Sequence, residues 1–212
     1  VLVIGINELR CLLNASALTD IFPSKHPARA QCWAHDVAVA LIARTLAQRI
    51  LPSQADSAFL AGLMHDVGKL LLIQRASEDF QKVINQIDQQ GLDYITAEGE
   101  IFLFDHTEVG QLIGEKWNFS SELIDVIRNH HQSWENLEFS GSKLSLTSII
   151  KAADIFAHAL ALGHGRGLSS LQRKAQEETE SAFKFLNIPA SESKDNLKRF
   201  SRTFETEFDL YS

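Results

Sequence analysis

The chain has 212 residues, of which 45% are hydrophobic and 22% charged, a composition typical of a globular protein with one or two domains. Its net charge of -7, from 20 lysines and arginines against 27 aspartates and glutamates, argues against nucleic acid as the main partner. No apolar run reaches the roughly 18 to 20 residues of a transmembrane helix, so no membrane partner is expected.

Apolar residues recur at helical spacing almost throughout, and no stretch alternates as a half-buried strand would. The sequence therefore predicts an all-α protein, a multi-helix bundle. The segment "ENLEFSGSK" is predicted to be a loop. In chain order, the predicted helices cover residues 3–18, 30–50, 57–74, 78–90, 106–117, the segment from Ser120 or Ser121 to His131, 144–162, and two amphipathic stretches beyond residue 167.

Polar residues at two helix starts indicate caps. Ser53 or Asp56 is expected to cap the helix that begins near residue 57. Asp105 followed by Glu108 is a variant of the capping box, which places His106 in the first turn of its helix.

Several histidines and aspartates fall in these helices, some of them within long apolar runs. Burial of an ionisable group is costly unless the group is paired or binds a metal. Imidazoles and carboxylates from several helices suit one or two divalent transition metals such as Fe, Mn, Ni or Zn, two ions lying about 3.5 to 4 Å apart. The candidate ligands are His35, His65, Asp66, His106, His130, His131 and Asp154.

The pair His65 and Asp66 raises a geometric problem. Neighbours on a helix differ by about 100° in direction, so both side chains reach one site only if they point into a concave junction. Gly62 and Gly68 flank the pair and would let a neighbouring helix or an ion approach the backbone. Lys69 lies on the face of Asp66 and could bind phosphate or protonate a leaving oxygen.

Ordinary structural roles stay open for each of these residues. A single buried histidine is usually a hydrogen-bonded core residue, and imidazolium is favoured at a helix C-terminus. In such interpretations His106, His130 and His131 are surface or cap residues, Asp154 pairs with Lys151 or His158, and Lys69 neutralises Asp66.

The motif "HDVGK", preceded by a helical histidine and followed by a late aspartate, resembles the HD superfamily of metal-dependent phosphohydrolases. The stretches "FLAGLMHDVGKLLL" and "EGEIFLFDHTEVGQLIGEKWNFSSELIDVIRNHH" resemble more closely the HDOD family, the HD-related output domains of bacterial signalling proteins. Upstream, "GINELRCLLNASALTDIF" and "CWAHDVAVALIARTLA" fit the same family, so the resemblance covers about residues 1–160.

This resemblance implies an HD-type bundle with a central metal site, acting in cytoplasmic signal transduction through a signalling partner or a fused signalling domain. Many HDOD domains have lost catalysis because their metal positions are incomplete. Here His35, His65, Asp66 and Asp154 match the four positions that hold the first metal of HD phosphohydrolases, and His106, His130 and His131 match the histidines that HD-GYP cyclic-dinucleotide phosphodiesterases use for further metals. Lys69 matches their lysine after HD, so Asp66 and Lys69 are the catalytic residues expected of an active domain.

The sequence also departs from these families. It reads "QSWENLEF" after "HH", without a glycine-tyrosine-proline motif, which argues against cleavage of cyclic di-GMP. Leu103 stands where the HDOD pattern usually has glycine, while Glu98 keeps the family's acidic position. We therefore expect a regulatory domain with a metal site. The alternatives are an active phosphohydrolase for a nucleotide or other phosphoester, and a nucleotide sensor without turnover.

For domain organisation, the sequence predicts an HDOD domain over residues 1–165, lacking N-terminal helices or a preceding module because the chain starts without methionine. Residues 166–212 are predicted to form helices that pack on the same domain or offer a partner surface. The two cysteines lie in apolar helical contexts, which fits a reducing cytoplasm.

Overall fold

The structure is a computed structural model that describes residues 20–139, 144–163 and 168–211. The regular elements of this part of the chain are all helices, which confirms the predicted all-α fold. The helix predicted over 3–18 lies outside the described residues. In chain order the elements are α2 (Pro27–Ile50), η1 (Pro52–Gln54), α3 (Ala55–Met64), α4 (Val67–Arg75), α5 (Ser77–Gln90), α6 (Tyr94–Phe102), α7 (His106–Lys116), α8 (Ser121–Asn129), α9 (Trp134–Phe139), α10 (Leu146–Ala159), α11 (Ser169–Phe185), η2 (Ala190–Glu192), α12 (Ser193–Glu207) and η3 (Phe208–Leu210).

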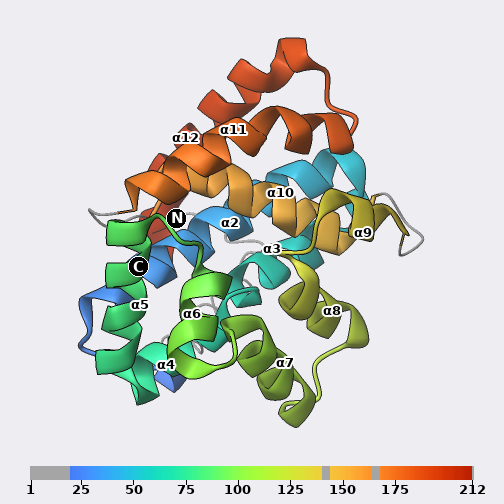
Figure 1. Cartoon of the computed structure of the whole chain (residues 1–212). Helices are drawn as coiled ribbons and strands as arrows, with labels where there is room; N and C mark the ends of the chain where they lie inside the picture. Colours follow the sequence, from blue (N-terminus) through green and yellow to red (C-terminus); the bar gives the residue numbers. More distant parts are fainter. Residues whose placement is uncertain (1–19, 140–143, 164–167, 212) are drawn as a thin grey trace.

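Helix α2 is the centre of the bundle, with α3 and α10 packed against it (Figure 1). Residues 37–43 are each at most 1% exposed, because apolar side chains cover the whole circumference of the helix there. The helix starts three residues earlier than predicted. Pro27 takes its first position, and the ring of His26 accepts a hydrogen bond from the Ala28 N–H.

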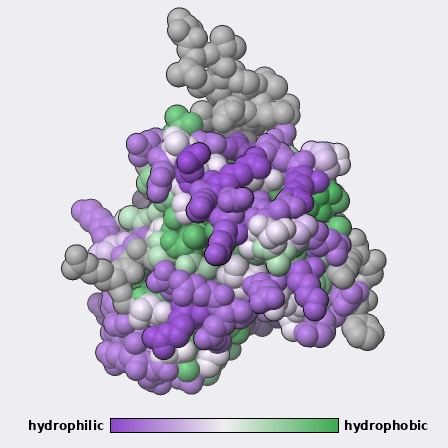
Figure 2. Space-filling view, turned by 90° about the horizontal axis from the view of Figure 1, so that it is seen from above, coloured by the Kyte–Doolittle hydropathy of each residue, from purple (hydrophilic) through white to green (hydrophobic). Residues whose placement is uncertain are grey.

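Helices α11 and α12 cover one side of this centre, and α4 to α8 lie on the other side (Figure 1). Phe156 of α10 stacks on Phe183 of α11 and on Phe200 of α12, with ring centroids 4.3 and 5.5 Å apart. The apolar face predicted for the last helix thus packs on the main core. The outer face of this side is largely hydrophilic, with small separate apolar patches (Figure 2). The domain boundary at residue 165 stays a prediction.

Some local predictions are wrong. Neither Ser53 nor Asp56 caps α3, because a turn of 3₁₀ helix leads directly into it. The predicted loop after residue 134 contains α9, in which Trp134 and Leu137 pack on the core. Helix α6 was not predicted; Asp93 caps it by accepting a hydrogen bond from the Thr96 N–H.

The capping box predicted at the start of α7 is confirmed, with Asp105 and Glu108 each accepting a backbone hydrogen bond. Ser120 likewise caps α8. Among the described helices, none combines the length and the apolar character needed to cross a membrane.

Candidate metal centre

A break between two helices brings His65 and Asp66 to one site. The single helix predicted over residues 57–74 is wrong: α3 ends at Met64, α4 begins at Val67, and the two residues between them form a turn. His65 is fully buried, Asp66 is 2% exposed, and His65 Nε2 lies 3.5 Å from Asp66 Oδ2. The turn supplies the concave junction that adjacent residues of a continuous helix lack.

The glycines beside this turn permit close packing, as the sequence predicts. A Cβ added at Gly62 would lie 2.4 Å from the Cα of Ala40 in α2, and one added at Gly68 would lie 1.9 Å from the carbonyl oxygen of His106 in α7. Backbone therefore approaches backbone at both positions. These approaches place the helices that carry the other histidines against the turn.

Four predicted ligands, Asp66 and three histidines, form one group. Asp66 Oδ1 lies 3.2 Å from His106 Nε2 and 3.5 Å from His130 Nε2, while His106 Nε2 lies 3.2 Å from His131 Nε2. One donor atom from each residue lies within 4.8 Å of the others, so the four could hold one ion. His131 is exposed and the other three are buried, which puts His131 at the open side of the group.

The other three predicted ligands form a second group, linked to the first through His65. His35 Nε2 lies 2.9 Å and His65 Nε2 4.0 Å from Asp154 Oδ1. The same oxygen also lies 3.2 Å from His158 Nε2, four residues further along α10. The sequence predicts His158 only as an ion-pair partner of Asp154, and the spacing of four residues is the signal for its place in the site. All seven predicted ligands thus converge on two adjoining groups.

The hydrogen bonds of three imidazoles direct their Nε2 atoms into the site. In each ring Nδ1 forms a hydrogen bond with an acceptor: that of His65 with the Gly62 carbonyl at 2.7 Å, that of His106 with the Glu98 carboxylate at 2.7 Å and that of His130 with the Ile127 carbonyl at 3.0 Å. A neutral imidazole that donates from Nδ1 keeps a lone pair on Nε2. The Nε2 atoms of His65 and His130 are buried and have no hydrogen-bond partner among the described residues. The arrangement fits transition-metal ligands, because an ion would satisfy these atoms.

Glu98 has a supporting role in this geometry. It is fully buried, and one carboxylate oxygen accepts hydrogen bonds from both the backbone N–H of His106, at 2.8 Å, and its ring. The acidic position that the sequence analysis left without a role therefore fixes the orientation of His106.

The electrostatics of the site favour a neutral His65 beside an ionised Asp66, but a protonated His106. Burial lowers the pKa of His65 to about 3. Burial would raise the pKa of Asp66, but His65, Lys69 and His106 hold it well below its ordinary value. For His106, burial lowers the pKa, but the carboxylates of Glu98 and Asp66 outweigh it and raise the pKa to about 9. Metal binding at this ring would therefore displace a proton.

Lys69 pairs with Asp66 rather than facing open space. Its Nζ donates to Asp66 Oδ2 at 2.5 Å and lies 4.0 Å from the centroid of the Tyr94 ring. The side chain is 3% exposed and borders a cavity of about 30 Å³, roughly the room of one water molecule. Of the two roles weighed for Lys69, neutralising Asp66 is the one that these contacts favour.

Asp36 is a member of the site that the sequence analysis missed. It is fully buried, burial raises its pKa well above the ordinary value, and neither carboxylate oxygen has a hydrogen-bond partner among the described residues. A donor atom of Asp36 lies within 4.8 Å of donor atoms of His65 and Asp66. The repeated His-Asp dipeptide at 35–36 and 65–66 was the available signal.

A cleft of about 510 Å³ adjoins the exposed side of the two candidate ligand groups. Its volume is typical of a small-molecule site. Its lining includes His131 and Asp154 from these groups, together with His158, which contacts Asp154. Its cationic residues are Arg128, Lys151 and Lys174.

Comparisons with known proteins agree with this architecture. The sequence profile of the HDOD domain matches residues 1–133. Among curated proteins, none matches the chain by sequence. An HDOD domain protein of unknown function from Geobacter sulfurreducens superposes with a TM-score of 0.71 at 23% identity, covering 98% of this chain and 70% of that one.

Two further solved structures share the fold. A protein from Shewanella amazonensis SB2B, described only provisionally as a phosphohydrolase, has a TM-score of 0.72 at 20% identity, covering 98% of this chain and 74% of its own. A protein from Marinobacter aquaeolei VT8, described provisionally as a signal transduction protein, has a TM-score of 0.73 at 16% identity, covering 99% of this chain and 46% of its own. At these identities the likeness establishes the fold alone.

Proposed function

The chain belongs to the HDOD family, and on that premise we propose that it is a bacterial, cytoplasmic signal-transduction domain whose output depends on a divalent transition metal. The output is contact with a signalling protein or a fused signalling domain. The observation that carries the proposal is the convergence of imidazole Nε2 atoms and carboxylate oxygens on two adjoining groups. A purely structural cluster would pair these atoms through hydrogen bonds, whereas two buried Nε2 atoms here lack a hydrogen-bond partner among the described residues.

The proposed ligands divide between the two groups. Asp66, His106, His130 and His131 would hold one ion, and His35, His65 and Asp154 a second. Mixed nitrogen and carboxylate donors suit Fe, Mn, Ni or Zn. The proposal covers one or two ions, since His65 and Asp66 lie next to each other and join the two groups.

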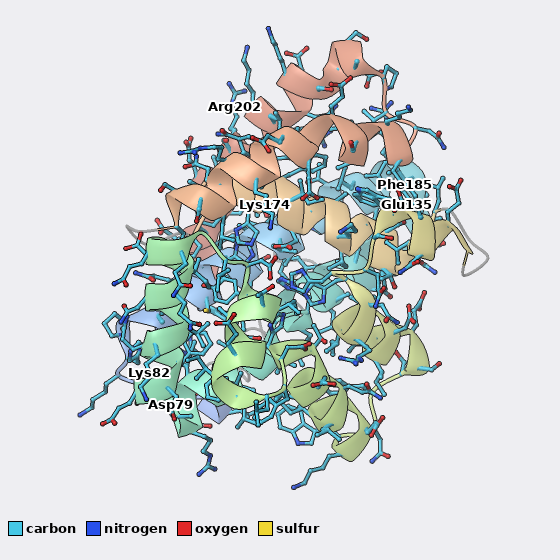
Figure 3. All side chains as sticks on the ribbon, in the orientation of Figure 1. Asp79, Lys82, Glu135, Lys174, Phe185 and Arg202 are labelled. Atoms are coloured by element: carbon cyan, nitrogen blue, oxygen red, sulfur yellow. The ribbon has the colours of Figure 1, made fainter. Side chains whose placement is uncertain are left out.

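Elemental analysis of protein purified without chelator or metal-affinity tag tests the metal. The variant Asp66→Asn removes the carboxylate that faces three proposed ligands, and Asp79→Asn makes the same change on an exposed aspartate of α5, at the edge of the molecule (Figure 3). We expect one or two equivalents of a transition metal in the parent and in Asp79→Asn, and a marked loss in Asp66→Asn. A parent free of transition metal would refute the proposal.

The signalling output needs a separate test, because metal binding alone does not establish it. Asp66→Ala is compared with the parent for binding to the signalling partner, after circular dichroism has established that both are folded. Loss of partner binding together with the metal supports a metal-dependent output. Unchanged partner binding by a folded, metal-free variant contradicts that dependence.

A second candidate function is hydrolysis of a phosphoester such as a nucleotide, and the cleft beside the two candidate ligand groups favours it. A bound divalent ion would supply an activated water and a polarised phosphoryl oxygen. In this proposal the cleft residues bind the ligand, Asp66 orients the site and Lys69 balances its charge. Metal-dependent release of phosphate or of a phosphomonoester by the parent, and its absence in Asp66→Asn, would establish hydrolysis. No turnover by fully metallated parent across phosphoesters and nucleotides would exclude it.

A further inference from the structure

The three cationic residues of the cleft differ in what they contact. The guanidinium of Arg128 donates to Thr107 Oγ1 at 2.7 Å and lies 3.4 Å from Glu108 Oε1. Lys174, which reaches from α11 toward the middle of the molecule (Figure 3), pairs with Asp93 at 3.2 Å. Both therefore have polar partners within the protein.

Lys151 is the exception among them. It is only 9% exposed, yet no carboxylate of the residues that the structure describes forms an ion pair with it. Its Nζ lies 5.0 Å from the centroid of the Trp134 ring, which stabilises a cation through its π face without accepting an ion pair. Glu178, Asp154 and Glu135 act on it only from a longer range. A buried ammonium group without an ionic partner is costly, and an anion entering from the cleft would offset that cost.

Lys151 lies on the same helix as Asp154, one of the proposed ligands. Lys151, Asp154 and His158 line the cleft from one helix, α10, at spacings of three and four residues. The rise between Lys151 and Asp154 is about 4.5 Å along the helix. An anionic group at Lys151 would therefore lie close to, but apart from, a phosphoryl group bound to an ion that Asp154 would hold. This spacing suits a ligand that carries two linked anionic groups, such as a diphosphate.

We propose that Lys151 is the anion-binding residue of the cleft and selects phosphoesters that carry a second anionic group, as a diphosphate does. The inference rests on the proposed function only in that a phosphoester enters the cleft. It applies equally to a ligand that is hydrolysed and to one that is only bound. Lys151 is thus a specificity residue, separate from the lysine that pairs with Asp66.

The test measures the Kd of methylene diphosphonate, a non-hydrolysable diphosphate, for Mn²⁺-loaded protein by calorimetry, with metal content assayed before and after titration. Removal of a charge-assisted hydrogen bond predicts binding weaker by about tenfold or more in Lys151→Met. Lys151→Arg keeps the charge and is expected to stay within about threefold of the parent. Lys82→Met, which removes a lysine charge from an exposed position of α5, is the matched control and should bind like the parent (Figure 3).

Glu178→Gln is an independent variant that leaves Lys151 in place. Glu178 borders the cleft and repels an anion there, so its neutralisation should tighten binding by about threefold. Parent-like binding by metallated Lys151→Met, or no tightening in Glu178→Gln, would overturn the role of Lys151 while leaving a phosphoester cleft in place. A fully metallated parent that does not bind the probe would overturn both.

Discussion

The packing of α4 on α7 makes a sharp prediction at Gly68. In Gly68→Ala the new Cβ would lie 1.9 Å from the carbonyl oxygen of His106, whereas real contacts of this kind do not fall below 3.0 Å, so the two helices must separate by about 1.1 Å. Overpacking costs about 1 to 3 kcal/mol, and the upper part of this range, about 2 to 3 kcal/mol, applies here because the neighbour is backbone, which cannot rotate away. Alanine recovers about 1 kcal/mol of helix propensity. The net effect is a destabilisation of about 1 to 2 kcal/mol.

Thermal unfolding followed by circular dichroism measures this effect. For a chain of this size the expected fall in Tm is about 2 to 8 °C. Gly99→Ala is the matched control: nothing lies within 4 Å of a Cβ added at Gly99 in α6, so the same substitution should raise Tm by about 1 to 4 °C. Because His106 moves with α7, Gly68→Ala should also lose part of its metal. A Gly68→Ala protein as stable as Gly99→Ala would refute the close approach on which this reasoning depends.

Further predictions concern other parts of the fold. Asp93→Ala should destabilise the protein by about 1 kcal/mol at pH 7, and Asp93→Asn by less, because both Asp and Asn cap a helix. Hydrogen bonds from Thr96 and Lys174 outweigh burial and lower the pKa of Asp93. The stabilisation of the fold by the Asp93 carboxylate is therefore full above the ordinary pKa of 3.8 and is lost as the pH falls through the lower folded-state pKa. Urea unfolding of the parent and of Asp93→Ala across this pH range would show whether their difference in stability disappears. Phe156→Ala, which removes the ring shared by α11 and α12, should cost about 3 to 5 kcal/mol in a single unfolding transition, and a transition that splits in two would indicate independent units. Chelator should lower the Tm of the parent but not that of Asp66→Asn, and equal shifts would contradict a specific site.

The fold class and the membership of the site were predictable for different reasons. Helical spacing of apolar residues persists along almost the whole chain, and the centre of α2 is apolar on every side, so an all-α core follows from the pattern alone. The seven ligand candidates share the property that burial would be costly without compensation. That criterion selects residues by type and context, which a sequence displays, and the structure brings all seven together.

The turn at 65–66 was not predictable from the same pattern. Both α3 and α4 bury apolar residues up to the break, so hydrophobic periodicity runs through it without interruption. The break depends on packing partners distant in sequence, such as Ala40 against Gly62 and His106 against Gly68. Helix α9 was missed for another reason: it has only six residues, too few for a periodicity to show.

Lys69 and Lys151 show that sequence spacing alone does not assign a role to a lysine. Lys69 follows Asp66 by three residues and Lys151 precedes Asp154 by three, so each lysine lies one turn of helix from a proposed ligand. In the fold, however, Lys69 donates to Asp66 and borders a cavity of about 30 Å³, while Lys151 borders the cleft of about 510 Å³ without an ion-pair partner among the described residues. A lysine already bound to a carboxylate can bind an anion only by giving up that contact, whereas an unpaired one gains a partner. Recognition of a ligand anion is therefore assigned to Lys151 by tertiary structure, although the resemblance in sequence points to Lys69.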